Sequence, residues 1–214
     1  MSSESDFARE VSSDTLFDGR LKCFQHKDGY RFSVDAVLLA HFSAPHRRER
    51  VLDLGCGCGV VALVMAFRDT NIHIDCLELQ AGLACLAARN ISENGFADRV
   101  AVIEGDMRDC VELFDGRVYD RVVCNPPYRR RDGSRLNRDP EQAAARHELT
   151  ADLEVVIGAA SIGLGIGGRL DLIYPASRSA NLLPALPTVP LSRKGCRWST
   201  AIPARRVSWS SLRR

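Results

Sequence analysis

Hydrophobic and polar positions along most of this chain follow two alternating patterns, one typical of buried strands and one typical of helices. Short apolar runs of strand length are followed by segments whose apolar residues recur every three to four positions. The segment from Gln80 illustrates the second pattern, because its apolar residues form one helical stripe that ends at Asn94-Gly95. The predicted strands lie near 51–54, 72–78, 99–103, 118–124 and 168–174, and the predicted helices lie near 59–68, 80–94 and 151–162.

This alternation predicts an α/β fold with a mostly parallel sheet and helices on both faces. The part of the chain before residue 51 has another pattern. Residues 14–25 alternate around Asp18-Gly19, which predicts a small hairpin beside the main sheet. From Ser33 to about His41 the apolar residues have helical spacing, and Ser33 is a suitable N-cap. Residues 1–13 are polar, and we expect them to form a flexible tail.

The C-terminal end differs from the rest of the chain in composition. After Asp171 there is no Asp or Glu, while Arg, Ser, Pro and Trp accumulate, and no strand pair is recognisable from about Pro184. We therefore expect a single domain over residues 14–183 and an atypical basic tail over 184–214. We hypothesise that the segment from about Pro184 results from a shifted reading frame or from another alteration of the end of the gene. An intact frame that encodes the same tail in close relatives would contradict this hypothesis.

Composition and charge exclude several protein classes. The 214 residues include 45% hydrophobic residues and carry a net charge of +2, which is typical of a soluble globular protein. No apolar run is long enough to span a membrane and the start is polar, so we expect a cytoplasmic protein. Most of the eight cysteines lie in apolar segments, and no second pair stands at zinc-site spacing from Cys56 and Cys58. We therefore expect free thiols and no bound metal.

The candidate chemistry centres on an apolar run that ends at Asn125-Pro126-Pro127-Tyr128. Proline forces the preceding residue out of the helical region, so we expect Asn125 at the carboxyl edge of a strand, where α/β sheets bind ligands. The Asn125 side-chain oxygen and the Pro126 carbonyl then offer two adjacent acceptors, with the flat ring of Tyr128 beyond them. These groups suit a planar NH2 group, although such proline steps on their own more often form turns.

A glycine loop precedes this motif and predicts a nucleotide cofactor. The loop follows Asp53 at the end of a strand, and its glycines are Gly55, Gly57 and Gly59. We expect Asp53 and these glycines to contact the cofactor. Glycine lets the backbone turn tightly and approach a ligand, and the helix that follows presents its positive N-terminus. Glu78 ends the next strand about twenty residues later, the spacing at which an acid binds ribose hydroxyls.

Two residues after the third strand complete the predicted cofactor site. Asp106 offers an acceptor to an adenine amine and Met107 an apolar contact to its ring, although Asp106 could instead cap the short helix that follows. These features also fit a nicotinamide oxidoreductase, whose loop obeys the same physics. Hydride transfer does not need the Asn-Pro-Pro-Tyr motif, and the usual Tyr-Lys or His-Asp pair is not recognisable. The sequence therefore does not favour hydride transfer.

A basic stretch lies directly after the motif. It includes Arg129, Arg130, Arg131 and Arg135. A charge run of this kind is usually a solvated loop. Because arginine pairs bidentately with phosphate, its position beside the candidate site favours a nucleic acid over a small substrate.

Taken together, the glycine loop, Glu78 and the Asn-Pro-Pro-Tyr motif resemble the class I S-adenosylmethionine methyltransferases, which have a Rossmann-like fold. Residues 14–42 and 145–148 are similar to bacterial valine-tRNA adenine-N6-methyltransferases, which modify the adenosine beside the anticodon. The resemblance covers about 14–180. It implies methyl transfer from S-adenosylmethionine to N6 of an adenosine in a tRNA anticodon loop, and we expect a monomer that needs no metal or membrane.

The same resemblance assigns further residues. It implies that Asp35 and Phe32 line the cofactor pocket, that Asn125 contacts the cofactor as well as the base, and that Arg146 and His147 support the RNA or the catalytic loop. Apart from Asn125, these residues could equally be core or loop anchors. DNA adenine and protein glutamine remain alternative substrates, because an amide NH2 fits the same acceptors. An inactive remnant that binds cofactor or RNA also remains open, because the closing strands of the family are not recognisable from Pro184 onward.

Overall fold

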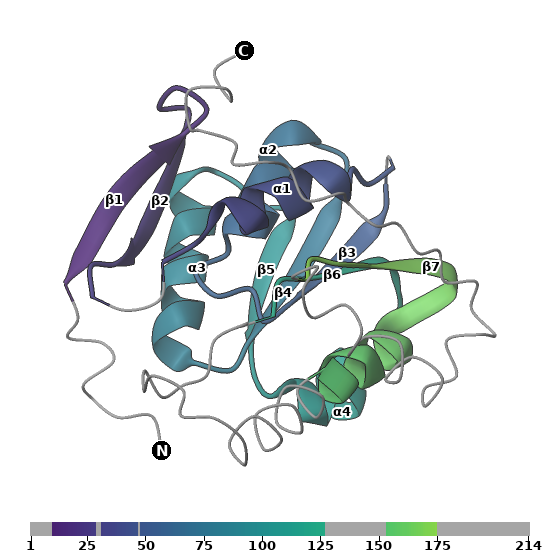
Figure 1. Ribbon diagram of the computed structural model, residues 1–214. Helices are drawn as coiled ribbons and strands as arrows, with labels where there is room; N and C mark the ends of the chain where they lie inside the picture. The colour runs from purple at the N-terminus through teal and green to yellow at the C-terminus, as the bar shows by residue number, and fades with distance from the viewer. Residues whose placement is uncertain (1–9, 29–30, 47, 127–152, 175–214) are drawn as a thin grey trace, which may run out of the picture.

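The structure is a computed structural model that describes residues 10–28, 31–46, 48–126 and 153–174. A five-stranded sheet with the order β5-β4-β3-β6-β7 forms its centre, and every neighbouring pair in it runs parallel (Figure 1). The strands are β3 (Arg50–Leu54), β4 (His73–Glu78), β5 (Val100–Glu104), β6 (Tyr119–Cys124) and β7 (Leu164–Leu172). The predicted α/β fold with a parallel sheet is therefore confirmed.

Helices cover both faces of this sheet (Figure 1). Helices α1 (Val34–Phe42), α2 (Val60–Arg68) and α3 (Ala81–Glu93) pack with one face, and α4 (Cys110–Phe114) and the helical residues 153–163 pack with the other. Val51 belongs to the first apolar cluster, whereas Leu52 and Leu54 belong to the second. Strand β3 is apolar at successive positions because both of its faces are buried.

The chain visits β3, β4 and β5 in order and then returns to the other side of β3. A short helical turn, Met107–Asp109, and α4 lead from β5 into β6, which pairs with β3. Helix α3 ends as predicted, because its C-cap is Asn94 and the next residue, Gly95, has a φ of 72°. Ser33 is the N-cap residue of α1, but its side chain makes no capping hydrogen bond.

Strand β7 begins four residues earlier than the sequence predicted, at Leu164 rather than near 168. The segment Leu164–Leu172 contains three glycines, which lack the side chains that give a strand its apolar signal. Gly167 has a φ of 79°, and the pairing with β6 shifts register between Tyr119 and Arg121. Tertiary pairing therefore extends the strand into residues whose local preference is weak.

The predicted N-terminal hairpin is present as a separate two-stranded sheet. Strand β1 (Val11–Leu16) pairs antiparallel with β2 (Leu21–His26), and the hairpin lies beside α3 (Figure 1). Phe17, Asp18 and Gly19 in its turn all have positive φ. Because β1 begins at Val11, it includes three residues that the sequence analysis assigned to the flexible tail.

The cysteines in the described part of the chain are all free thiols, and each of them except Cys85 is buried. Among the described residues, no group of three or more His, Cys, Asp or Glu could hold a metal ion. None of the helices among the described residues has the length and apolarity needed to cross a membrane.

Candidate active site

The candidate site lies between β3 and β6, where the strand order of the sheet changes direction. Strands β4 and β5 lie on one side of β3, and β6 and β7 lie on the other. Leu54 pairs with Cys124, so Gly55 and Asn125 leave the sheet side by side at its carboxyl edge. Open α/β sheets bind ligands in the crevice at such a point. The two motifs that the sequence singled out therefore meet.

The glycine loop has the backbone conformation that its sequence predicted. Gly55, Gly57 and Gly59 have φ values of 69°, 59° and 80°, which residues with a side chain rarely adopt. Gly59 has a second reason to be glycine, because a Cβ at this position would lie 3.2 Å from the Cβ of Ala87 on α3. Helix α2 begins directly after Gly59, so its N-terminus is available for a negatively charged group.

Glu78, at the end of β4, holds the glycine loop in place through a hydrogen bond. Its Oε2 accepts a hydrogen bond from the Gly57 N–H at 2.8 Å, and its Oε1 accepts one from the Gln80 N–H at 2.9 Å. A carboxylate oxygen has two lone-pair directions, so each oxygen can still accept a second bond. This geometry is compatible with a contact to ribose hydroxyls, which stays a prediction.

Asp53 lies beneath the loop and is almost fully buried, with 1% of its surface exposed. Burial and the nearby Glu78 carboxylate raise the pKa of Asp53 to about 7, while a hydrogen bond from the Ala62 N–H opposes this rise. Asp53 Oδ2 has no hydrogen-bond partner among the described residues. The site therefore contains one unfilled acceptor under the glycine loop, and a contact of Asp53 with the cofactor stays a prediction.

Asn125 provides a second unfilled acceptor. Its side-chain Oδ1 is buried and has no hydrogen-bond partner within the part of the chain that the structure describes. Val123 pairs with Asp53, and side chains alternate along a strand, so Asn125 continues the side of the sheet that carries Asp53. Buried polar atoms are nearly always bonded, and an exception at this edge indicates a place that a ligand completes. Pro126, which follows, is buried.

Asp106 and Met107 follow β5 at the same edge. Asp106 accepts a hydrogen bond from the Arg108 N–H at 2.9 Å and forms an ion pair with the Arg108 guanidinium. These bonds from Arg108 hold the pKa of Asp106 below its usual value. The capping alternative is therefore realised, and the contact with an adenine amine stays a prediction. Met107 Cε lies 3.8 Å from the position that a Cβ on Gly55 would take, so its thioether lies beside the loop.

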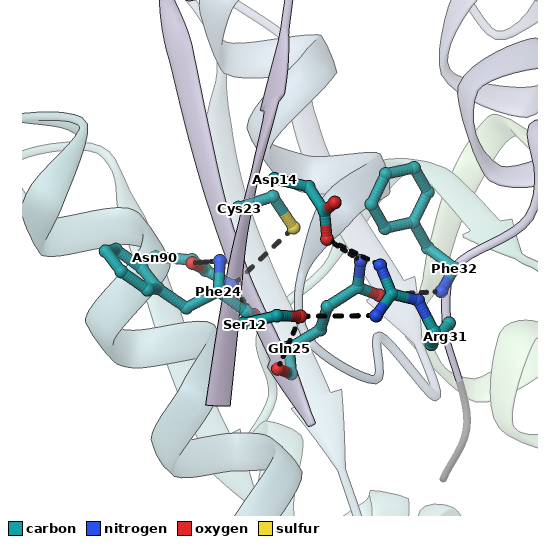
Figure 2. A network of polar contacts seen from close by, with 8 residues as sticks. All are labelled: Ser12, Asp14, Cys23, Phe24, Gln25, Arg31, Phe32 and Asn90. Carbon is teal, nitrogen blue, oxygen red and sulfur yellow. Dashed lines mark hydrogen bonds and ion pairs between the residues drawn. The ribbon is translucent and has the colours of Figure 1, made fainter. Parts of the chain in front are cut away.

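The start of α1, which the resemblance placed at the cofactor pocket, is tied to the hairpin. Figure 2 shows that the Phe32 N–H donates to Gln25 Oε1, at 3.2 Å, and that Arg31 pairs with Asp14, at 2.8 Å. Asp35 lies in the first turn of α1 and is partly buried. The hairpin therefore determines where this segment enters α1, and the contacts of Phe32 and Asp35 with a cofactor stay predictions.

The sequence analysis missed Asn90, a polar residue that is fully buried. Its Oδ1 accepts a hydrogen bond from the Phe24 N–H at 2.6 Å, and its Nδ2 donates to the Cys58 carbonyl at 2.8 Å. The sequence feature that could have identified Asn90 is its position on the apolar stripe of α3, between Ala87 and Ile91. A polar residue on a buried helix face needs partners, and here they belong to the hairpin and the glycine loop.

The other predicted site residues lie outside the described part of the chain. They are Pro127, Tyr128, Arg129, Arg130, Arg131, Arg135, Arg146 and His147. Stacking by the tyrosine ring and phosphate contacts by the arginines therefore stay predictions. The proposed altered tail from about Pro184 also lies outside these residues.

Comparison with known sequences identifies relatives over most of the chain. Relatives named tRNA1(Val) (adenine(37)-N6)-methyltransferase include one from Aeromonas hydrophila, which is 31% identical over 154 residues, or 72% of this chain and 63% of the relative. Another, from Porphyromonas gingivalis strain W83, is 32% identical over 158 residues, or 71% of this chain and 61% of the relative. The chain thus spans about three fifths of the length of these relatives.

Comparison with solved structures finds the same fold. TrmN from Thermus thermophilus has a TM-score of 0.57 at 24% identity, over 71% of this chain and 40% of that one. A protein described as a predicted O-methyltransferase from Agrobacterium tumefaciens has a TM-score of 0.55 at 27% identity, over 71% of this chain and 66% of that one. The family model described as the methyltransferase small domain matches residues 33–158, which include the glycine loop and the Asn125 motif. This chain therefore belongs to the methyltransferase small domain family.

Proposed function

We propose that this chain transfers a methyl group from S-adenosylmethionine to the exocyclic N6 of an adenosine in a tRNA anticodon loop. Membership of a methyltransferase family and the reaction named for its relatives both support the proposal. The single observation that carries it is the buried Oδ1 of Asn125 beside Gly55, which has no hydrogen-bond partner among the residues that the structure describes. An acceptor in this position is what an NH2 group needs if a cofactor in the glycine loop is to methylate it.

The residues at the carboxyl edge of the sheet fit the cofactor. When bound, S-adenosylmethionine supplies an electrophilic methyl group on a sulfonium centre. Glu78 retains one acceptor direction on each oxygen after it binds Gly57 and Gln80, which suits a pair of ribose hydroxyls. The thioether of Met107 beside Gly55 offers an apolar contact to a base. Asp106, whose carboxylate stays ionised beside Arg108, offers an acceptor for an adenine amine.

Asn125 and Pro126 would act on the adenine that is methylated. The N6 lone pair is delocalised into the ring, so the amine is a poor nucleophile until its geometry changes. Hydrogen bonds from its two hydrogens to Asn125 Oδ1 and the Pro126 carbonyl stabilise the positive charge that develops on the nitrogen. Alignment of the amine with the methyl group supplies roughly 7–11 kcal/mol by the effective-molarity argument. Tyr128 would stack on the base and hold it flat against these acceptors.

The substrate must present a base that can leave its stack. Extrusion of a base costs a few kcal/mol, roughly, and least where the base is unpaired, as in an anticodon loop. Arg129, Arg130, Arg131 and Arg135 follow the motif directly in the sequence and would contact the phosphates around the extruded nucleotide. A tRNA loop is therefore the substrate that combines an accessible adenine with a dense array of phosphates.

Methyl transfer to defined RNAs tests the proposal. The purified chain is incubated with tritiated S-adenosylmethionine and an unmodified valine tRNA, and the product nucleosides are separated. We expect N6-methyladenosine, and no such product when the adenosine beside the anticodon is replaced by guanosine, which carries a carbonyl oxygen in place of the N6 amine. Asn125→Ala should lower the rate by about 10²- to 10³-fold while S-adenosylhomocysteine still binds, with at most the loss of one contact.

Three results would contradict the proposal. The first is turnover of Asn125→Ala close to that of the unmodified protein, which would remove Asn125 from the chemistry. The second is methylation of a DNA duplex or of a glutamine-containing peptide in place of tRNA, which would give the same site another substrate. The third is the absence of any binding of S-adenosylmethionine in a calorimetric titration.

A further inference from the structure

Two side chains of α3 bind the backbone of the hairpin strand β2. Asn94 accepts a hydrogen bond from the Lys22 N–H at 2.9 Å and donates one to the Lys22 carbonyl at 2.7 Å. One turn earlier, Asn90 accepts from the Phe24 N–H at 2.6 Å and donates to the Phe24 carbonyl at 2.9 Å (Figure 2). Residues four apart lie on one face of a helix, and residues two apart share one edge of a strand. The two carboxamides therefore bind alternate residues of β2.

Only one of these two asparagines is bonded to the glycine loop in the described structure. Asn90 Nδ2 donates to the Cys58 carbonyl at 2.8 Å, between Gly57 and Gly59. One turn before Asn90 on α3, Ala87 packs against Gly59. A Cβ on Gly59 would lie 3.2 Å from the Ala87 Cβ. Helix α3 therefore supports the loop at two adjacent points, one by contact and one by a hydrogen bond.

The other side of the hairpin fixes the segment that leads into α1. Gln25, of which 2% is exposed, donates to Asp14 and accepts from the Phe32 N–H at 3.2 Å. Arg31 adds an ion pair with Asp14 at 2.8 Å (Figure 2). Phe24, through Asn90, and its neighbour Gln25 thus connect the glycine loop on one side with Phe32 on the other. The hairpin joins two walls of the proposed cofactor site.

We propose that Asn90 is a positioning residue for the cofactor, which holds the Cys58 carbonyl and thereby the conformation of the glycine loop between Gly57 and Gly59. The hairpin contributes by holding the Asn90 carboxamide in the orientation that this bond needs. A loop that is already ordered loses less conformational freedom when a ligand binds, so the bond raises cofactor affinity. This inference rests on the proposed function, because it concerns the same cofactor site.

A matched pair of variants separates this role from the docking of the hairpin. Asn90→Ala releases Phe24 and the weak bond to Cys23 Sγ, and Asn94→Ala releases Lys22 and the Asn90 carbonyl, but only Asn90→Ala also releases the glycine loop. Affinity for S-adenosylhomocysteine is measured by calorimetry at a temperature at which both variants are folded. We expect Asn90→Ala to bind about tenfold more weakly, because a buried carbonyl loses its partner. Asn94→Ala should stay within about twofold of the unmodified protein. Equal affinities of the two variants would overturn the proposal.

A second variant and a measurement on the unmodified protein cover the case in which Asn90→Ala does not fold. Asn90→Asp keeps the acceptor for the Phe24 N–H but removes the donor to the Phe24 and Cys58 carbonyls, and it should also bind S-adenosylhomocysteine more weakly. In the unmodified protein, saturation with S-adenosylhomocysteine should slow hydrogen exchange of the Asn90 side-chain NH2 and leave that of Asn94 unchanged. An equal response of both asparagines would contradict the proposal.

The same titration distinguishes a failure of this inference from a failure of the proposed function. If the unmodified protein does not bind S-adenosylhomocysteine at all, the proposed function fails and Asn90 has no cofactor to position. If the unmodified protein binds it and a folded Asn90 variant binds it equally well, the inference alone fails.

Discussion

The two edges of the parallel sheet carry polar side chains in opposite states. Near the amino-terminal edge, the Tyr119 hydroxyl donates to Asp75 at 2.7 Å, and the Arg50 guanidinium lies 3.7 Å from the same carboxylate. At the carboxyl edge, Asp53 Oδ2 and Asn125 Oδ1 are buried without partners among the described residues. The Asp75 carboxylate at the first edge is bonded, although Arg99 Nε directly before β5 is also buried without a partner among the described residues, and the second edge contains acceptors that the described chain leaves unfilled.

This difference is consistent with a first edge that stabilises the fold and a second edge that binds the proposed cofactor and base. A buried acceptor without a partner lowers the stability of the fold by about 1–3 kcal/mol. Such a cost is typically retained at positions that serve a function, such as ligand binding. A bonded network offers no vacant acceptor, and its disruption acts on folding instead. Substitutions at the amino-terminal half of the sheet should therefore change stability without changing cofactor affinity.

The largest effect is expected for Arg121, which is buried in the amino-terminal half of β6. Its guanidinium donates to Glu49 at 2.9 Å and pairs with Asp171 of β7. Arg121→Met keeps the length of the side chain but leaves two carboxylates facing each other without their cation. We expect the free energy of unfolding to fall by about 3–5 kcal/mol, as when one partner of a buried ion pair is removed. Urea denaturation measures this loss.

A compensated variant sharpens the test of Arg121. Replacement of all three charges, by Arg121→Met with Glu49→Gln and Asp171→Asn, removes the repulsion as well as the attraction and should recover much of the stability. The affinity for S-adenosylhomocysteine should stay unchanged in both variants at low temperature. A single substitution that costs less than about 1 kcal/mol would show that this buried arginine does not stabilise the sheet.

At the opposite edge, Asp53→Asn should change how stability depends on pH. The pKa of the Asp53 carboxyl is about 7 in the folded protein, because burial and the Glu78 carboxylate disfavour its charge, and 3.8 is its ordinary value. As the pH rises from about 4 to about 7, the unfolded chain loses this proton before the folded one does, so stability falls. The difference corresponds to at most about 4 kcal/mol of stability, fully lost above pH 7.

Chemical denaturation without ligand at pH 5 and at pH 8 measures this effect. Asp53→Asn has no carboxyl to ionise, so its stability relative to the unmodified protein should increase between the two pH values. The same substitution at Asp98, an exposed carboxylate, is the matched control. An equal pH dependence in the unmodified protein and in Asp53→Asn would show that Asp53 is already ionised at pH 5.

The sheet could be predicted because its signals are local. Continuous apolar runs such as Val122–Cys124 identify strands buried on both faces, and the alternation with helices predicts the parallel topology. The N-terminal hairpin could also be predicted, because its strands alternate around an Asp-Gly turn. Strand β7 was placed four residues late because its glycines carry no apolar signal and only its pairing with β6 defines it. Its start depends on contacts distant in sequence.

The site was predictable in position but not in its bonding. The loop glycines and Asn125 are recognisable from backbone constraints that glycine and proline impose, and the register of Leu54 with Cys124 brings them together. Asp53 Oδ2 and Asn125 Oδ1 lack hydrogen-bond partners among the described residues. The sequence does not predict this, because the tertiary packing determines whether a polar atom has a partner. Asn90 was missed for the same reason, since its partners lie 32 and 66 residues away in the chain.

The smallest expected effect concerns Tyr119, whose hydroxyl binds Asp75 at the amino-terminal edge. Tyr119→Phe removes this bond but keeps the edge-to-face packing on Phe114, at 5.7 Å between ring centroids, and Asp75 retains Arg50 at 3.7 Å. Unfolding in urea should therefore become easier by only about 1 kcal/mol, the usual net value of one hydrogen bond. Calorimetry should find the affinity for S-adenosylhomocysteine unaltered. A loss of affinity in this variant would show that the two edges are coupled through the strands, and would remove the separation between a stabilising edge and a ligand-binding edge.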